Sequence, residues 1–340
     1  IHIKRNNENF ILRLNSELAN LHFVDCSVNT AGRNIVGLIG TSAASIHDVN
    51  FENISIENKS TARTYMGVIA YQQGGRIGIY DEQHPELGKV VLKNIKVGTN
   101  GIKNVQVGGL SGYVTGFAQL DNIEVEQITV KGNGYVGGLV GNGGNASYDH
   151  ITMKDIQVTS YGNRYVGGLV CCMSCTYNSN SKAGIHNVKI SGTPVYDDEG
   201  NVVDSTTVIA FDKKNLLTGS NNTNSSHIGG ITGYTTVYEN GFYYDPKSKE
   251  YENAPIAIDG IVVKGYTNYI GGAYGYSYRT DNVTVSNSLI TEADQVTVAS
   301  QRVGGISGYQ YYDARRLECK NTRVVISNHS RVGLIAGEKV

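Results

Sequence analysis

The hexads VGGLSG at 107–112, VGGLVG at 136–141 and VGGLVC at 166–171 lie at nearly constant spacing along the chain. Six further copies read IVGLIG at 35–40, YMGVIA at 65–70, IGGITG at 228–233, IGGAYG at 270–275, VGGISG at 303–308 and VGLIAG at 332–337. Their fourth residues are 30, 42, 29, 30, 62, 42, 33 and 29 residues apart. A fixed period of this kind indicates a repeat architecture with a unit of about 30 residues. The interval of 62 contains either a long insertion or an additional, degenerate repeat.

A second short motif recurs between the hexads. It reads NISI at 53–56, NIKV at 94–97, NIEV at 122–125, DIQV at 155–158, NVKI at 187–190 and NVTV at 282–285, with weaker copies at 25–28, 260–263 and 321–324. Alternating apolar and polar residues rich in β-branched side chains are typical of a half-buried strand. Six asparagines should then lie above one another as a hydrogen-bonded ladder, or else form a row of metal or sugar ligands: Asn53, Asn94, Asn122, Asn187, Asn282 and Asn321.

The spacing inside the hexad predicts a bend. Val136 and Leu139 are three residues apart, so one uninterrupted strand cannot turn both of them inward. The pair Gly137–Gly138 should therefore form a bend or bulge, where glycine accepts a positive φ and lets neighbouring backbones approach closely. The fourth hexad residue is almost always aliphatic, which indicates the core. The fifth varies freely and is expected at an outward or edge position.

Two strand motifs and a glycine bend every 30 residues predict an all-β fold in which each repeat stacks on the last. We expect a right-handed parallel β-helix, a solenoid of nine or more coils, that forms one domain over residues 1–340. No convincing helical periodicity of ten or more residues is present. The chain starts at Ile1 without a basic-then-apolar leader and stops soon after a hexad, which predicts a mature product or a fragment of a longer protein.

Composition excludes several classes of protein. With 29 basic and 30 acidic residues, charge favours neither nucleic acid nor an anionic membrane, and no apolar run is long enough to span a bilayer. The 42 glycines lack the three-residue period of collagen. Cys26 and Cys319 should be buried core thiols. Cys171, Cys172 and Cys175 resemble half a zinc site that nothing completes, so a local disulfide or free thiols are expected, with no metal and no cofactor.

The hexads resemble the GLUG repeat, whose core is Gly-Leu-any-Gly. GLIG at 37–40, GLSG at 109–112 and GLVG at 138–141 match it, and GITG, GAYG and GISG at 230–233, 272–275 and 305–308 are near matches. This resemblance implies β-helical regions of large bacterial surface and secreted proteins, including non-catalytic parts of streptococcal immunoglobulin A-cleaving metallopeptidases. The sequence contains neither the HExxH motif of zinc peptidases nor the LPxTG motif of sortase substrates, so peptidase activity and wall attachment do not carry over.

Insertions in a solenoid usually carry the binding function. They are expected near 71–88, 193–226 and 234–255, and hairpins are expected at 195–203 and 242–251. Candidate binding residues for a host glycan or host protein are aromatic: Tyr238, Phe242, Tyr243, Tyr244, Tyr251, Tyr309, Tyr311 and Tyr312. A second tyrosine series directly follows the hexads and predicts a stacked structural ladder: Tyr71, Tyr113, Tyr234, Tyr276 and Tyr309.

We therefore expect a non-catalytic adhesin, binding or spacer segment of a larger bacterial protein, located outside the cell or on its surface. The first alternative is a polysaccharide-processing β-helix enzyme, which needs paired carboxylates across a groove. Loop candidates for such a pair are Asp81, Glu82, Glu86, Asp197, Asp198, Glu199 and Asp245, although a turn explains residues 197–200 better. The second alternative is a subunit of a fibre or appendage, with end coils stacked between chains.

Overall fold

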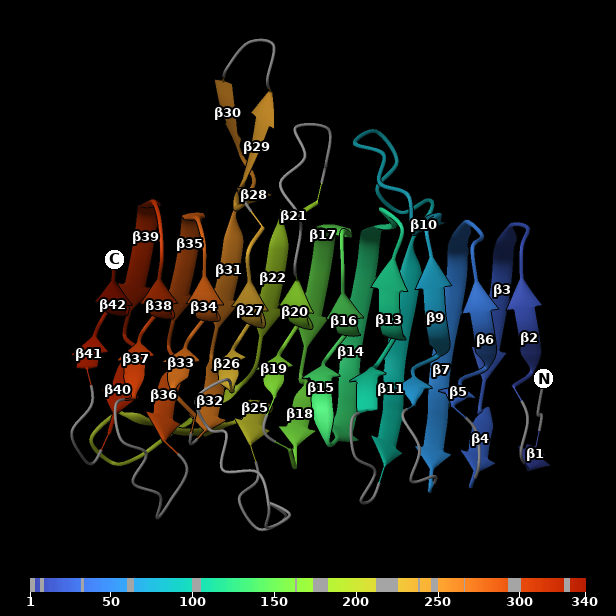
Figure 1. The fold of residues 1–340 in the computed structure, drawn as a ribbon, viewed down its shortest axis with the longest axis horizontal. Helices are drawn as coiled ribbons and strands as arrows, with labels where there is room; N and C mark the ends of the chain where they lie inside the picture. Colours follow the sequence, from blue (N-terminus) through green and yellow to red (C-terminus); the bar gives the residue numbers. More distant parts are fainter. Residues whose placement is uncertain are drawn as a thin grey trace.

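A computed structural model of the chain is built from strands, and its described residues contain no helix. The structure describes residues 4–6, 9–31, 34–59, 64–99, 105–162, 164–173, 183–211, 226–237, 239–245, 250–265, 267–292, 301–326 and 331–340. Within these ranges, no helix has the length and apolar character needed to cross a membrane. The strands form three large parallel sheets and two antiparallel hairpins (Figure 1).

The hexads supply two of the large sheets. Over the described residues, sheet C takes the first half of each hexad in nine strands: β5 (Ile35–Val36), β8 (Tyr65–Met66), β12 (Val105–Gly108), β15 (Gly134–Gly137), β19 (Tyr165–Gly167), β26 (His227–Gly229), β33 (Tyr269–Gly271), β37 (Arg302–Gly304) and β41 (Arg331–Gly333). Sheet B has ten described strands. β2 (Ile11–Leu14) precedes the first hexad, and the other nine take the second half of each hexad: β6 (Ile39–Ser42), β9 (Ile69–Gln73), β13 (Ser111–Thr115), β16 (Val140–Gly143), β20 (Val170–Met173), β27 (Thr232–Thr235), β34 (Tyr274–Ser277), β38 (Ser307–Gln310) and β42 (Ala336–Lys339).

The segments between hexads form the third sheet, which we call sheet A. Its nineteen described strands are β1 (Lys4–Asn6), β3 (Leu18–Val24), β4 (Ser27–Thr30), β7 (Ile46–Asn58), β10 (Arg76–Ile77), β11 (Val90–Thr99), β14 (Gln119–Gly132), β17 (Ser147–Lys154), β18 (Gln157–Ser160), β21 (Gly184–Ile185), β22 (Val188–Ser191), β25 (Thr207–Phe211), β28 (Glu239–Asn240), β31 (Ile256–Asp259), β32 (Ile261–Gly265), β35 (Thr280–Ser286), β36 (Leu289–Glu292), β39 (Ala314–Lys320) and β40 (Arg323–Val325).

Each repeat pairs in parallel with the next one, sheet by sheet. Val107 pairs with Val136 in sheet C, Ser111 pairs with Val140 in sheet B, and Ile123 pairs with Ile151 in sheet A. Figure 1 shows the strands of successive repeats side by side along the long axis. Across the interval of 62 residues, β19 pairs directly with β26 and β20 pairs with β27. The long interval is therefore one repeat with insertions, and it hides no additional repeat.

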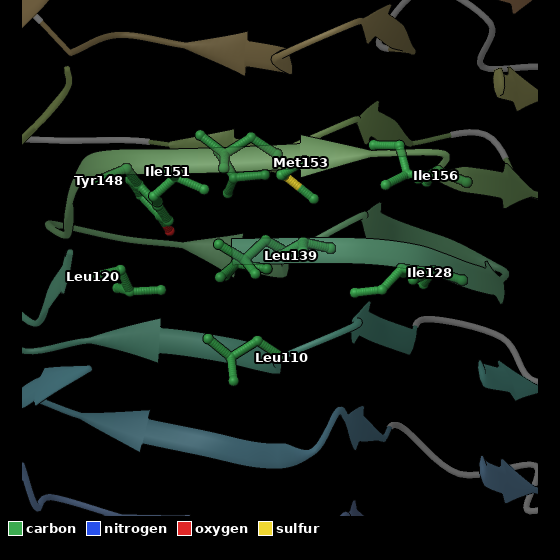
Figure 2. Packing of buried hydrophobic residues seen from close by; sticks show 14 of the residues in the cluster. Leu110, Leu120, Ile128, Leu139, Tyr148, Ile151, Met153 and Ile156 are labelled. Atoms are coloured by element: carbon green, nitrogen blue, oxygen red, sulfur yellow. The ribbon is translucent and has the colours of Figure 1, made fainter. Parts of the chain in front are cut away.

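The interior is one continuous apolar core. Inward residues from all three sheets form a single cluster that runs from Leu14 to Ile306. Figure 2 shows how successive hexads place their fourth residues, Leu110 and Leu139, one above the other beside Ile128 and Met153 from sheet A. A lone repeat would expose this face to water, so stacking supplies the burial that stabilises each unit.

The hexad glycines are needed for close approach between backbones. A Cβ on Gly137 would lie 1.9 Å from the carbonyl oxygen of Val140, and one on Gly138 would lie 2.0 Å from that of Gly168. This part of the sequence interpretation is confirmed. The expectation of positive φ is wrong, because no described hexad glycine is among the residues with positive φ. The chain turns between sheets C and B with ordinary backbone angles and leaves no room for a side chain.

The fifth hexad residue is buried, contrary to its predicted outward or edge position. Ser111, Val140, Thr232 and Tyr274 are all fully buried. Ser111 lies two residues before Tyr113 in β13, so both face the same side of sheet B. On that side sheets B and C meet at an inward corner, where Tyr113 of sheet B stacks on Tyr65 of sheet C with ring centroids 5.7 Å apart. The corner buries a position that would be exposed on a flat sheet.

The asparagine ladder divides into two rows, so the predicted single row is wrong. Strand register places Asn94 beside Asn53 in one row. Asn122 and Asn187 belong to a second row, at a different position in the repeat. The motif therefore occurs twice in each repeat. Asn94 Nδ2 donates to Asn53 Oδ1 at 2.8 Å, and Asn53 Nδ2 donates to Asp25 Oδ1 at 2.9 Å, which gives the first row the expected hydrogen bonds.

Both rows mark a backbone conformation. The row positions have φ values near +50°, including Asn53 at 55° and Asn122 at 49°. Among non-glycine residues, asparagine and aspartate best tolerate this left-handed region, because their short side chains hydrogen-bond locally. The recurring asparagine thus marks corners of sheet A, and β7 has two such corners, at Asp48 and Asn53.

Gln127 provides a test of this explanation. It occupies the first row with a φ of 58°, and its side chain is exposed. Gln127→Asn is expected to raise the free energy of unfolding by about 1 kcal/mol, since asparagine adopts this conformation at lower cost. Thermal and urea denaturation would measure the change. Gln73→Asn is the control, because Gln73 is exposed in β9 and is not among the positive-φ residues. An equal gain in both variants would contradict the explanation.

The insertions leave the repeats at two places. Two insertions lie outside the large sheets. One is residues 78–89, which follow β10. The other is the hairpin of β29 (Phe242–Asp245) and β30 (Glu250–Asn253), which follows β28. Both rise from the same edge in Figure 1. The predicted 193–226 insertion contains the expected hairpin, β23 (Pro194–Tyr196) with β24 (Val202–Ser205). It also contains β25, which returns to sheet A between β18 and β32, so this stretch is a hairpin followed by a repeat strand.

Candidate functional site

An aromatic strip follows the inward corner where sheets B and C meet. Register places its members in two rows, one on each sheet. The sheet B row is Tyr71, Tyr113, Tyr234, Tyr276 and Tyr309, and the sheet C row is Tyr65, Tyr135, Tyr165, His227 and Tyr269. The sheet B row is the ladder predicted from the sequence, and stacking confirms it. The sheet C row was missed, although its signal is present: Tyr135, Tyr165, His227 and Tyr269 each directly precede a hexad.

Ring contacts join the strip within and between its rows. Tyr276 and Tyr309 stack with centroids 5.2 Å apart and planes 7° apart. Tyr165 of sheet C stacks on Tyr234 of sheet B at 5.2 Å and 18°. Such spacing is close to the separation of neighbouring strands in a sheet, so the repeat itself dictates the stacking. These contacts cover ring faces along the strip with neighbouring rings.

The strip stays uncharged near neutral pH. Burial, with smaller contributions from neighbouring groups, raises the pKa of Tyr165 and of Tyr276 to about 12. Burial lowers the pKa of His227 to about 4, and His227 Nδ1 lies 2.6 Å from the Ser226 carbonyl oxygen. The phenols of Tyr165 and Tyr276 therefore keep their protons and can both donate and accept hydrogen bonds. The tyrosines of both rows are partly exposed, so a ligand can reach their hydroxyls.

Arginines lie over two parts of the strip. The Arg302 guanidinium is 5.2 Å from the Tyr269 ring centroid and 5.6 Å from that of Tyr309. Arg164 lies 5.5 Å above Tyr135, and its side chain also donates to the Tyr135 hydroxyl at 3.3 Å. Cation–π contacts of this kind add positive charge beside uncharged rings. Arg302 also forms an ion pair with Glu338, which compensates its charge. The strip therefore offers hydroxyls along its length and the positive charge of Arg164 beside Tyr135.

The sheet B row is interrupted in two successive repeats. Register places Asn142 and then Cys172 between Tyr113 and Tyr234. The Cys172 thiol donates to Asn142 Oδ1 at 3.4 Å. At this level Tyr135 and Tyr165 of sheet C continue the strip, with an edge contact at 5.8 Å and 61°. The middle of the strip thus has a different surface from the stacked runs on either side.

The candidate residues after the hexad at 303–308 separate into two groups. Tyr309 belongs to the aromatic strip. Tyr311 and Tyr312 lie in the following turn, 37% and 49% exposed, and contact each other and Tyr278. They form a small exposed aromatic cluster outside the two rows.

The candidates in the β29–β30 hairpin contribute to its base. Phe242 is 1% exposed, with Arg279 stacked 5.1 Å from its centroid. The Tyr243 hydroxyl donates to Asp149 Oδ2 and accepts from Asn187 Nδ2 at 3.0 Å. Tyr244 and Tyr251 face each other as backbone partners across the hairpin. Their side chains, and Tyr238 as a whole, lie outside the described residues.

The loop carboxylates that could serve an enzyme are dispersed. Asp197 Oδ1 accepts from the backbone nitrogens of Glu199 and Asn201 at 3.1 and 2.8 Å, so it holds the predicted turn. These hydrogen bonds, led by that from Asn201, lower the pKa of Asp197. Asp81 Oδ1 accepts from the Gln83 nitrogen at 2.9 Å in a different insertion. The side chain of Asp245 lies outside the described residues.

The cysteines occupy several environments. Cys26 is 2% exposed, and Cys319 is partly buried against the core, which agrees with the core thiols expected from the sequence. Cys171 is buried and Cys172 faces the strip, and both thiols are free. Cys175 lies outside the described residues. Among the described residues, no group of three or more His, Cys, Asp or Glu side chains could hold a metal ion.

Comparisons with protein-family models, with curated proteins and with solved structures found no match for this chain.

Proposed function

We propose that the chain is a right-handed parallel β-helix that acts as a non-catalytic extracellular binding segment of a bacterial surface or secreted protein. Support for the helix comes from the parallel pairing of every hexad with the next one in both sheets B and C. Right-handedness follows from the strong preference of parallel crossover connections for that hand. The GLUG-like hexads support the bacterial surface assignment, because this repeat is typical of such proteins.

The observation that carries the binding proposal is the aromatic strip. It runs through successive repeats from Tyr65 to Tyr309, and its tyrosines are partly exposed. An extended host glycan suits this surface, because a sugar chain offers hydroxyls for the phenols and apolar ring faces for the tyrosine edges. A host protein segment is the alternative partner, since Tyr and Arg are also enriched in protein hot spots.

Glycan and host-protein arrays would test the strip. The double variant Tyr234→Ala/Tyr276→Ala removes two rings that stack at 4.9 Å, and it is expected to weaken binding at least about tenfold. The matched control is Tyr311→Ala/Tyr312→Ala, which removes two exposed rings outside the strip. Circular dichroism establishes that both variants are folded. If only the control variant lost binding, the binding site would lie in the turn after Tyr309 and not in the strip. If the unaltered chain bound nothing, the spacer function would be the remaining proposal.

A further inference from the structure

Two insertions far apart in the sequence meet at one polar cluster on the repeats between them. The loop 78–89 contributes Tyr80, and hairpin strand β29 contributes Tyr243. Sheet A contributes the residues between these two, Asp121, Asp149 and His150, and Asn187 precedes β22. We call these six residues the histidine junction. Figure 1 shows the loop and the hairpin on the same edge of the molecule.

His150 is the centre of the junction. Its ring stacks on Tyr80 with centroids 3.5 Å apart and planes 7° apart. Its Nδ1 lies 3.1 Å from Asp121 Oδ1 and 3.1 Å from Asp149 Oδ1. A single imidazole thus contacts the loop through its face and two carboxylates through its edge. His150 itself has a φ of 46°, so it occupies a corner of sheet A in the row that also holds Asn122 and Asn187.

Asp149 connects the same histidine to the hairpin. Its Oδ1 accepts from Asn187 Nδ2 at 3.0 Å, and its Oδ2 accepts from the Tyr243 hydroxyl. Asn187 Nδ2 also lies 3.0 Å from the Tyr243 hydroxyl oxygen. The base of the hairpin and the loop are therefore joined through one aspartate and one histidine.

Negative charge surrounds His150 on several sides. The titratable groups that face it are Asp121 from β14, Asp149 from β17 and Glu82 from the loop, together with Tyr80, Tyr243 and His186. His186 is 2% exposed, and its burial lowers its pKa to about 4, so it is neutral. Burial acts to lower the pKa of His150, but the hydrogen bond that its Nδ1 donates to Asp121 and the charges of the three carboxylates outweigh it, and the net shift is upward.

The direction of that shift fixes the pH at which the junction is strongest. A histidine whose pKa is raised by folding contributes stability that is fully present below its unfolded pKa of about 6.5. That contribution is lost as the pH rises through the raised pKa of the folded state. An imidazolium against the Tyr80 ring gains a cation–π attraction that the neutral ring lacks. Loss of the proton therefore weakens both the stacking on Tyr80 and the attraction to Glu82.

We propose that the histidine junction is a pH-sensitive clamp, in which protonated His150 holds the loop 78–89 against the repeats and neutral His150 releases it. Asp149 couples the same event to the base of the β29–β30 hairpin. The clamp would let a change of pH alter the surface formed by the two insertions. It stands apart from the aromatic strip, and its test requires no ligand.

Other contacts hold the ends of the loop. Asn122 Nδ2 donates to the carbonyl oxygens of Ile79, Pro85 and Leu87 at 2.9 to 3.1 Å. On the other flank, Gly88 N donates to Asp48 Oδ1 at 2.8 Å, and His47 Nδ1 lies 2.7 Å from Asp48 Oδ2. Hydrogen bonds that the His47 ring donates to Asp48 and Glu17 raise the pKa of His47, so a second titrating histidine lies near the loop. A test must separate the two histidines.

Hydrogen exchange of the full chain at pH 5.5 and 8.5, corrected for intrinsic exchange rates, separates them. The reporters are the amides of Ile79, which donates to the Gly88 carbonyl at 2.8 Å, and of Leu87, which donates to that of His84 at 3.0 Å. Their protection is expected to fall at the higher pH, because the neutral imidazole attracts the Tyr80 ring and Glu82 less strongly than the imidazolium does. His150→Gln should remove this fall, and the control His47→Gln should keep it. Amides of sheet B, such as Leu139, report whether each variant is folded.

A second variant keeps the carboxylate contacts intact. Tyr80→Leu removes only the ring that stacks on His150, so it should lower loop protection at pH 5.5 to the value the unaltered chain shows at pH 8.5. The proposal would be overturned if loop protection in His150→Gln fell between pH 5.5 and 8.5 as much as it does in the unaltered chain. It would also be overturned if only His47→Gln abolished the pH-dependent decrease in protection, because the effect would then belong to the Asp48 flank.

Discussion

Gly138→Ala is expected to destabilise the fold by at least about 3 kcal/mol, because the added methyl group has no space. Its Cβ would lie 2.0 Å from the Gly168 carbonyl oxygen and 3.1 Å from the Gly168 carbonyl carbon of the next repeat. Gly138 N donates to the Gly167 carbonyl oxygen at 3.0 Å, so neither backbone can retreat without breaking the contact between repeats. The melting temperature and the urea midpoint would measure the loss.

Gly98→Ala is the matched control for this substitution. Gly98 lies in a parallel strand, β11, and its added Cβ would meet Lys131 Cβ at 3.9 Å, an ordinary contact. We expect a change within about 0.5 kcal/mol of zero, as for most surface substitutions. If the two variants lost the same stability, the conformational freedom of glycine, and not the close approach of backbones, would explain why glycine occurs at these positions.

Phe51→Ala is expected to lower the free energy of unfolding by about 3 to 5 kcal/mol, the usual cost of removing a buried aromatic ring. Phe51 is fully buried in β7 and stacks on Phe23 of the preceding repeat at 5.2 Å and 14°. Its removal leaves a cavity between two repeats, because the parallel strands on both sides fix the spacing. Urea denaturation followed by circular dichroism would measure the loss.

The exposed Phe117 separates loss of packing from loss of an aromatic residue as such. Phe117 is 58% exposed, so Phe117→Ala should change stability by no more than about 0.5 kcal/mol. Its φ of 58° is equally unfavourable for alanine and phenylalanine, so the backbone contribution cancels. A large effect at Phe117, or none at Phe51, would contradict the buried stack between repeats.

Several features could be predicted from the sequence because they are local and recur. The hexad spacing predicted parallel stacking, and the period of about 30 residues predicted which strands pair. The aliphatic fourth position of the hexad predicted inward residues such as Leu110 and Leu139, and the two hairpins followed from short strands around turn residues. The sheet B tyrosine row was also predictable, since each member directly follows its hexad.

Other features depended on how far each repeat extends between its bends. The two asparagine rows share one sequence motif. The motif alone therefore could not distinguish two corners that lie five residues apart in the same strand, such as Asp48 and Asn53 in β7. The fifth hexad residue is buried because sheets B and C meet at an inward corner, an angle that alternation does not encode. The same corner brings Tyr165 against Tyr234 and so joins two rows into one strip.

The sequence by itself thus determined the repeat, its strands and the identity of most core residues, because neighbouring repeats contact each other through equivalent positions. Only the tertiary structure placed Tyr80, His150 and Tyr243 together, from segments up to 163 residues apart. Their meeting depends on where two irregular insertions leave the stack. No period in the sequence carries that information, since each insertion occurs once and its contacts form only after the repeats have stacked.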